Sequence, residues 1–165
     1  MIVAQLITRY LNELSGSTTK VAHLVEELSS HCNLKLFCKD SDNPIGDSVN
    51  HYQIANFFLP KSWPASHALA PKRLANNFFR FFNNFSNLTK EKYDLLHCHN
   101  LNSLLIANVY RDLIKKPIIF DSHGIISPSQ EKLFEIQKKL LPKCDGITVM
   151  SKGVGDYYNR ELGIP

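Results

Sequence analysis

The sequence predicts a doubly wound α/β domain with a mainly parallel sheet, and three observations predict it. Apolar segments of strand length alternate along the chain with segments of helical periodicity. Parallel strands need crossover connections and are buried on both faces, so they read as continuous apolar runs. Several of these runs end in polar residues, as expected where the strands of such a sheet meet a ligand. We expect the strand order 3-2-1-4-5-6.

Each element can be justified in turn from its pattern. The expected strands are apolar runs at residues 2–8, 34–39, 51–59, 94–99, 117–122 and 146–151. The first helix should be capped by Thr18 or Thr19, because apolar residues recur at helical spacing from Val21 to Leu28. Further helical regions are expected at residues 66–88, 101–115, 129–141 and 152–162.

Composition is typical of one globular domain. The chain has 165 residues, of which 44% are hydrophobic, and it carries a net charge of +4. It has no run of eighteen apolar residues and no signal-peptide pattern at its start, so we expect a cytoplasmic protein, with the inner face of the membrane as a possible location. The modest charge suits anionic ligands or membrane surfaces and does not call for nucleic acid. The four cysteines lack CxxC spacing, which favours reduced, buried thiols.

Two glycine-containing loops invite a phosphate-binding interpretation. Gly16 stands just before an expected helix start, where free backbone amides attract an anion such as a diphosphate, although an ordinary turn explains it equally well. Gly153 and Gly155 imitate a dinucleotide fingerprint, but Tyr158 occupies the third glycine position and no βαβ unit follows. A nicotinamide-dependent oxidoreductase is therefore a weak alternative.

The segment HCH at 97–99 raises the question of a metal. Strand alternation places His97 and His99 on one face and Cys98 on the other, so these three cannot share one ion. A site made of His97, His99 and His123 is conceivable, but we expect no metal. We expect His97 to be a packed histidine, and His99, nearer the strand end, to be the better candidate for ligand contact.

The segment DSHG at 121–124 holds the residue types of a hydrolase triad. Neighbours on one strand end point to opposite faces, so Asp121, Ser122 and His123 cannot form the relay. Instead, His123 is expected at the mouth of the sheet, where Gly124 allows close approach of a ligand. The plainer alternative is a histidine that caps the next loop.

The segment 71–86 concentrates phenylalanines and basic residues. On a helix Leu74 and four of the phenylalanines (Phe78, Phe81, Phe82 and Phe85) share one face, which either packs on the sheet or meets an anionic membrane or a lipid-linked substrate. The candidate contacts for the second alternative are Arg73, Phe78, Arg80, Phe81 and Phe82.

Four motifs occur in an order that is similar to a known family. They are SGSTTKVAHLVEELS after the first strand, YDLLHCHN at 93–100, KPIIFDSHG at 116–124 and KCDGITVMSKGVGDYYNRELGIP at 143–165. Together they resemble the N-terminal, acceptor-side domain of the family-4 glycosyltransferases of GT-B fold. The resemblance covers nearly the whole chain and implies one Rossmann-like domain over residues 1–165.

The resemblance also implies roles for individual residues. Gly16 would lie in the loop that closes over the donor diphosphate, with Ser17 or Ser15 where the family often has a second glycine. His123 would be the active-site histidine near the transferred sugar, followed by Gly124. The strand ends that face the cleft or its rim would supply the remaining contacts: His99, Asn100, Ser151 and Lys152.

The activity that the resemblance implies is transfer of a sugar, with retention, from a UDP- or GDP-sugar to a hydroxyl of a glycan or lipid-linked acceptor. The family needs no metal or cofactor, and its donor is held mostly by a second domain that is absent here. That domain would be a downstream half or a separate chain of a split enzyme, and this half alone should be nearly inactive. The alternative is a non-catalytic binding or scaffold module of the same fold.

Overall fold

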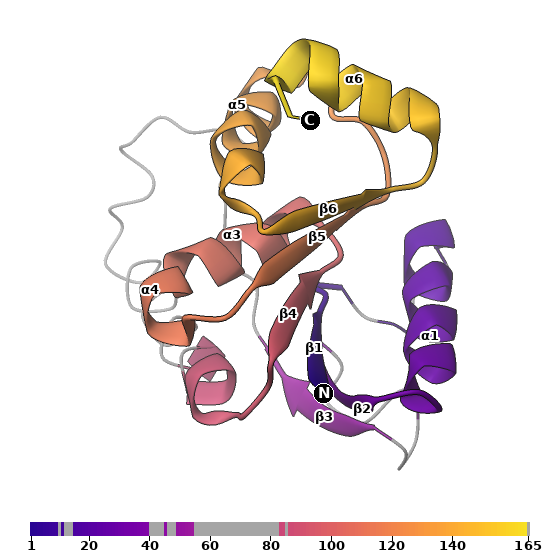
Figure 1. Ribbon diagram of the computed structural model, residues 1–165, viewed down its shortest axis with the longest axis vertical. Coiled ribbons are helices and arrows are strands. Elements are labelled where there is room, and N and C mark those ends of the chain that lie inside the picture. Colours follow the sequence, from indigo (N-terminus) through magenta and orange to yellow (C-terminus); the bar gives the residue numbers. More distant parts are fainter. Residues whose placement is uncertain are drawn as a thin grey trace.

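The fold is a six-stranded parallel sheet flanked by helices (Figure 1). The computed structural model describes residues 1–9, 11, 15–39, 45, 49–54, 83–84 and 86–164. The strands are β1 (Ile2–Leu6), β2 (Asn33–Cys38), β3 (Asn50–Gln53), β4 (Leu95–Cys98), β5 (Ile118–Ser122) and β6 (Gly146–Val149). Their order is β3-β2-β1-β4-β5-β6, and every pairing is parallel, which confirms the predicted topology.

The helices follow the predicted alternation with shifted ends. They are α1 (Gly16–Ser29), α3 (Leu101–Val109), α4 (Arg111–Ile114), α5 (Glu131–Leu140) and α6 (Lys152–Leu162), with a 3-10 turn at Leu141–Lys143. Most of the helix expected at 66–88 and the end of the strand expected at 51–59 lie outside the described residues, as do Arg73, Phe78, Arg80, Phe81 and Phe82. Among the described residues, no helix is long and apolar enough to cross a membrane.

The first helix starts earlier than the sequence suggested. Ser15, not Thr18 or Thr19, is its N-cap, and its hydroxyl accepts a hydrogen bond from the Thr18 backbone N–H. The Thr18 hydroxyl in turn accepts from the Ser15 backbone N–H, at 3.1 Å. This reciprocal pair is a capping box with threonine in the third position, and it satisfies two backbone donors at once.

The helix predicted at 101–115 is divided in two. Tyr110, with φ −100° and ψ 7°, leaves the helical conformation between α3 and α4. Lys115 then adopts the left-handed conformation, with φ 50°. Pro117 follows two positions later and disfavours a helical conformation at Lys116, which explains why the helix cannot run further.

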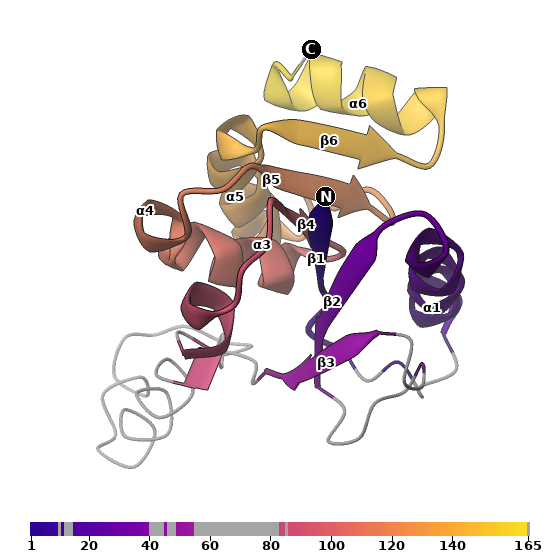
Figure 2. The same cartoon turned by 60° about the horizontal axis from the view of Figure 1, so that its bottom comes forward.

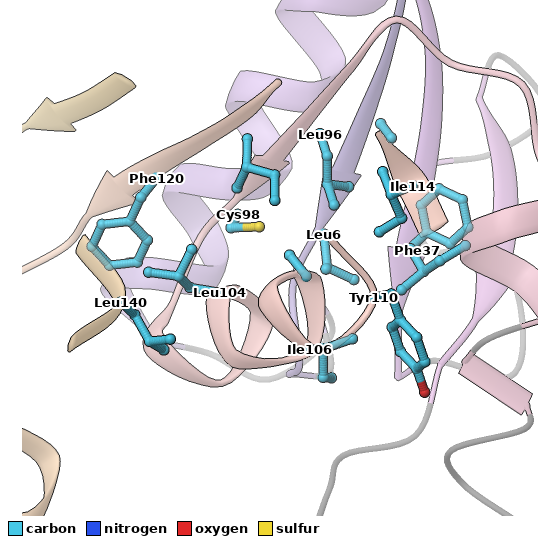
Figure 3. Packing of buried hydrophobic residues seen from close by; sticks show 14 of the residues in the cluster. Leu6, Phe37, Leu96, Cys98, Leu104, Ile106, Tyr110, Ile114, Phe120 and Leu140 are labelled. Atoms are coloured by element: carbon cyan, nitrogen blue, oxygen red, sulfur yellow. The ribbon is translucent and has the colours of Figure 1, made fainter. Parts of the chain in front are cut away.

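Two apolar clusters cover the two faces of the sheet. On one face, Val21 and Val25 of α1 pack on residues of β1 and β2 such as Val3 and Leu36. On the other face, α3, α5 and α6 cover a larger cluster, part of which is drawn in Figure 3: Leu6, Phe37, Leu96, Cys98, Leu104, Ile106, Tyr110, Ile114, Phe120 and Leu140. In Figures 1 and 2, α1 lies beside β1 and β2, whereas α6 lies beside the edge strand β6. Helices on both faces and apolar strands between them are what a doubly wound sheet requires.

Candidate functional site

Polar side chains interrupt the α1-facing side of the sheet near the carboxyl ends of the central strands. Gln5 of β1 pairs in register with His97 of β4, and Asp121 of β5 pairs with Thr148 of β6. Because side chains alternate along a strand, His99 and His123 follow on the same face as His97 and Asp121. The rings of His97 and His99 are 4.4 Å apart between centroids, as the alternation predicted. This buried polar strip lies at the centre of the sheet and needs a functional explanation.

Asp121 is the centre of this strip. It is 4% exposed, and its Oδ1 accepts a hydrogen bond from Thr148 Oγ1 at 2.8 Å. Its Oδ2 accepts from Lys20 Nζ of α1 at 3.1 Å. His99 Nδ1 and His123 Nε2 approach the same Oδ2 to 3.4 Å and 3.3 Å. One buried carboxylate therefore faces one cation and two imidazoles.

The environment decides the charge of each group in the strip. Burial favours a raised pKa for Asp121, but contacts with His99, Thr148 and Lys20 outweigh burial and hold the pKa far below its usual range. Burial lowers the pKa of His97 to about 4, with a further contribution from neighbouring His99. Burial also lowers the pKa values of His99 and His123, against the opposing effect of Asp121. At neutral pH the carboxylate is ionised and the three imidazoles are neutral.

His99 lies behind the site rather than in the open. It is 1% exposed, and its Nε2 is 2.6 Å from Gln5 Oε1. Both of its ring nitrogens thus face protein groups, Gln5 on one side and Asp121 on the other. The expected contact of His99 with a ligand stays a prediction. In the structure, the His99 side chain packs behind the pocket against Gln5 and Asp121.

A pocket of about 230 Å³ opens beyond the carboxyl ends of β1, β4 and β5. Its lining includes Ser17 at the start of α1, Asn100 after β4 and His123 after β5, together with Arg9. The Asn100 Oδ1 accepts from Thr8 Oγ1 and from the backbone N–H of Ser103, so its position is fixed. The Nδ2 of Asn100 has no hydrogen-bond partner among the described residues. A cationic, donor-bearing hollow of this kind suits an oxygen-rich, anionic ligand.

The backbone beside His123 is held from the opposite face of the sheet. The carbonyl oxygen of Gly124 accepts from Ser122 Oγ at 3.0 Å and from the Tyr158 hydroxyl at 3.2 Å. The two hydroxyls are 2.6 Å apart. Ser122 points away from Asp121 and His123, so these three residues form no catalytic relay.

The sequence-predicted residues fall into two groups. Ser17, His99, Asn100, His123 and Gly124 line the pocket. Three others do not line it: Gly16 is the exposed first residue of α1, and Ser151 and Lys152 are the exposed N-cap and first residue of α6. Gly153 and Gly155 lie inside α6 and form no loop ahead of a helix, which removes the basis for the nicotinamide alternative.

Sequence reasoning missed the partners of the central carboxylate. Asp121 stands two positions before His123, so strand alternation alone was a usable signal for their proximity. Thr148 lies on another strand, as does Gln5, which contacts His99, and Lys20 lies on α1, 101 positions away from Asp121. No local pattern marks those three residues.

The chain is similar to a known family and to several solved structures. A family model described as Glycosyltransferase Family 4 matches residues 14–165. A search of curated proteins found no match. Sucrose-phosphate synthase from Thermosynechococcus elongatus has a similar structure, with a TM-score of 0.67 and 16% identity, over 98% of this chain and 45% of that chain.

Two further solved structures are similar. The lipopolysaccharide outer core galactosyltransferase WaaB in its apo form gives a TM-score of 0.63 at 19% identity, over 100% of this chain and 43% of that chain. HepE of Anabaena in complex with UDP gives a TM-score of 0.50 at 11% identity, over 98% of this chain and 50% of that chain. These identities show a shared fold, which is that of GT-B glycosyltransferases. The chain spans about half the length of these proteins or less.

Proposed function

The chain belongs to glycosyltransferase family 4, and from this premise we propose that it forms the acceptor-side half of a retaining hexosyltransferase. The reaction is transfer of a sugar from a nucleotide sugar to a hydroxyl of a glycan or lipid-linked acceptor, without a cofactor. The observation that carries the proposal is the pocket at the carboxyl ends of the strands, where His123 stands among hydrogen-bonding side chains.

His123 and Asn100 have different proposed roles in the pocket. His123 is 15% exposed at its side chain, and its Nε2 faces the Asp121 carboxylate at 3.3 Å. A proton on Nε2 leaves the Nδ1 lone pair free to accept a hydrogen bond from a sugar hydroxyl. His123 therefore orients the sugar and is not a nucleophile. Asn100 Nδ2 supplies a donor to a ligand oxygen.

The donor phosphate would meet the start of α1. Ser17 lines the pocket, and Gly16 precedes it at the helix N-terminus, where unpaired backbone amides favour an anion. Apart from its chain neighbours and its own helix backbone, no described residue has a heavy atom within 4 Å of the position that a Gly16 Cβ would take, which leaves room for a ligand beside this backbone. UDP-sugars are the first donors to test, because HepE of Anabaena is solved with UDP.

We place the second wall of the cleft on a donor domain outside these 165 residues, in the same protein or on a separate chain. Most of the nucleotide would bind there, where backbone amides and basic residues would stabilise the leaving diphosphate. This half alone should consequently show almost no transfer.

The test joins the chain to its donor domain and assays transfer with UDP-glucose, UDP-galactose and GDP-mannose. With an active donor, His123→Ala should lower kcat/KM by about 100-fold, because the sugar loses its orienting contact. His23→Ala is the matched control, since the His23 side chain is 77% exposed on α1. Full activity of His123→Ala would remove His123 from the site. Absence of transfer with every donor domain encoded near the gene would favour the non-catalytic binding module.

A further inference from the structure

Three potential metal ligands converge behind the pocket wall. His97 and His99 of β4 and Asp121 of β5 each offer one ligand atom, and these atoms lie within 4.8 Å of one another. The sequence suggested His97, His99 and His123 as the conceivable set. The structure instead places the Asp121 carboxylate beside the two histidines of β4.

Two histidine ring nitrogens behind the pocket are open to a further ligand. His97 Nε2 and His99 Nδ1 are buried, and neither has a hydrogen-bond partner among the described residues. His99 is 1% exposed, so its nitrogen has no route to bulk water. Buried polar atoms without a partner are rare in proteins, because each costs about 1 to 3 kcal/mol.

The spacing of the two imidazoles around Asp121 Oδ2 is compatible with a shared metal ion as well as with long hydrogen bonds. His99 Nδ1 lies 3.4 Å from this oxygen and His123 Nε2 lies 3.3 Å from it. Hydrogen bonds from N–H to oxygen cluster near about 2.9 Å. In a tetrahedral zinc site with bonds of about 2.0–2.1 Å, neighbouring ligand atoms are about 3.3–3.4 Å apart.

The contact behind His99 is the one expected for a metal ligand. Its Nε2 is 2.6 Å from Gln5 Oε1, which accepts the proton of that nitrogen. With the Gln5 amide in this orientation the Nδ1 lone pair of His99 faces the Asp121 side, as metal binding requires. With the amide turned over, Gln5 Nε2, which is also buried without a hydrogen-bond partner among the described residues, would donate to His99 Nε2, and His99 Nδ1 would donate to Asp121. Histidine ligands of metals are usually oriented by such a contact through the second nitrogen.

We propose that His97, His99 and Asp121 bind a divalent transition-metal ion, with Zn²⁺ as the best fit. Two imidazoles and one carboxylate favour zinc over Mg²⁺ or Ca²⁺, which prefer oxygen ligands. The ion would anchor β4 to β5 behind the pocket and takes no part in sugar transfer.

Lys20 would compete with the metal ion for the Asp121 carboxylate. Its ammonium group occupies the same Asp121 oxygen at 3.1 Å, while its side chain is 40% exposed and free to swing into solvent. Metal binding must therefore displace Lys20 from Asp121. Removing this positive charge should tighten metal binding, an effect that a merely damaged fold could not produce.

The experiment is a titration of the chain after chelator treatment. ZnCl₂ is followed by calorimetry and CoCl₂ by visible absorption, with circular dichroism as a check on folding. We expect one ion per chain, cobalt bands of a four- or five-coordinate site, and loss of this binding in His97→Gln and Asp121→Asn. Lys20→Met should bind zinc more tightly, and Gln5→Leu should bind it about 10- to 100-fold more weakly.

The control is the double variant His23→Ala with His31→Ala, which removes two exposed histidines of the region around α1. It should bind zinc as the unchanged chain does. The proposal is overturned if the unchanged chain binds no stoichiometric zinc, if folded His97→Gln binds it equally well, or if Lys20→Met binds it no more tightly. These readouts do not involve sugar transfer, so they are independent of the proposed function.

Discussion

Lys20 and Asp121 are 101 positions apart in the sequence, yet Lys20 Nζ lies 3.1 Å from Asp121 Oδ2. The contact ties α1 to the centre of the sheet at the edge where the pocket opens. It also supplies the positive charge that a buried carboxylate needs, because an isolated buried charge is strongly destabilising.

Loss of the Lys20 ammonium should destabilise the metal-free chain moderately. We expect Lys20→Met to lower the free energy of unfolding by about 1 kcal/mol, because Asp121 keeps its hydrogen bond from Thr148 and Lys20 is partly solvated. Urea denaturation at pH 7 with a chelator measures this. The matched control is Lys152→Met at the exposed start of α6, expected within about 0.5 kcal/mol of the unchanged chain. Equal effects of the two variants would contradict the importance of the pair.

A second ion pair predicts how stability depends on pH. Glu91 receives hydrogen bonds from Lys35 Nζ and from the Tyr52 hydroxyl at 2.7 Å. These bonds hold the pKa of Glu91 below its ordinary value of 4.5. The native chain therefore binds the Glu91 proton less readily than the unfolded chain does, and the resulting stabilisation is present above pH 4.5 and disappears as the pH falls through the lower native pKa.

Glu91→Gln tests this linkage. The variant should be less stable at pH 7 by about 1 kcal/mol, and the difference from the unchanged chain should shrink as the pH is lowered toward 3. Denaturation curves at several pH values measure it. Glu135→Gln, an exposed glutamate of α5, is the control and should show no such convergence. A constant difference across the range would assign the loss to packing and not to charge.

The hydroxyl of Tyr158 should support the loop that carries His123. Tyr158→Phe removes contacts with Ser122 Oγ and the Gly124 carbonyl in a buried place, so we expect a loss of about 1 to 2 kcal/mol of unfolding free energy. Tyr157→Phe is the neighbouring control, since its hydroxyl makes only a 3.3 Å contact with the Ile126 carbonyl. Thermal denaturation compares the two. If Tyr157→Phe costs as much, the Gly124 carbonyl has no special role.

Membrane contact through the basic, phenylalanine-rich segment stays a prediction from the sequence. Co-sedimentation with anionic vesicles should fall with added salt and in the double variant Phe81→Asp with Phe82→Asp, because both charge attraction and apolar insertion are needed. Leu113→Asp controls for loss of an exposed apolar residue elsewhere, as Leu113 is 59% exposed on α4. An unchanged bound fraction in the double variant would exclude this segment.

Prediction from sequence succeeded where the signal is local or periodic. Strand-length apolar runs predicted the sheet and its order, and alternation correctly placed His97 beside His99 and separated Ser122 from Asp121. Helix ends were less accurate, because Ser15 and Thr18 cap each other through side chains, and such reciprocity is visible only in three dimensions.

The candidate site shows the same division. Gly124 and His123 were predicted from the sequence, because a buried strand that ends in polar residues is unusual on its own, and both line the pocket. The sequence by itself thus determined the fold class, the family resemblance and the strand ends at which we propose the site. Only the tertiary structure decided which groups surround Asp121, because Lys20, His99 and Thr148 come from three different elements or their ends. Register and helix packing bring such distant residues together, and neither leaves a local trace in the sequence.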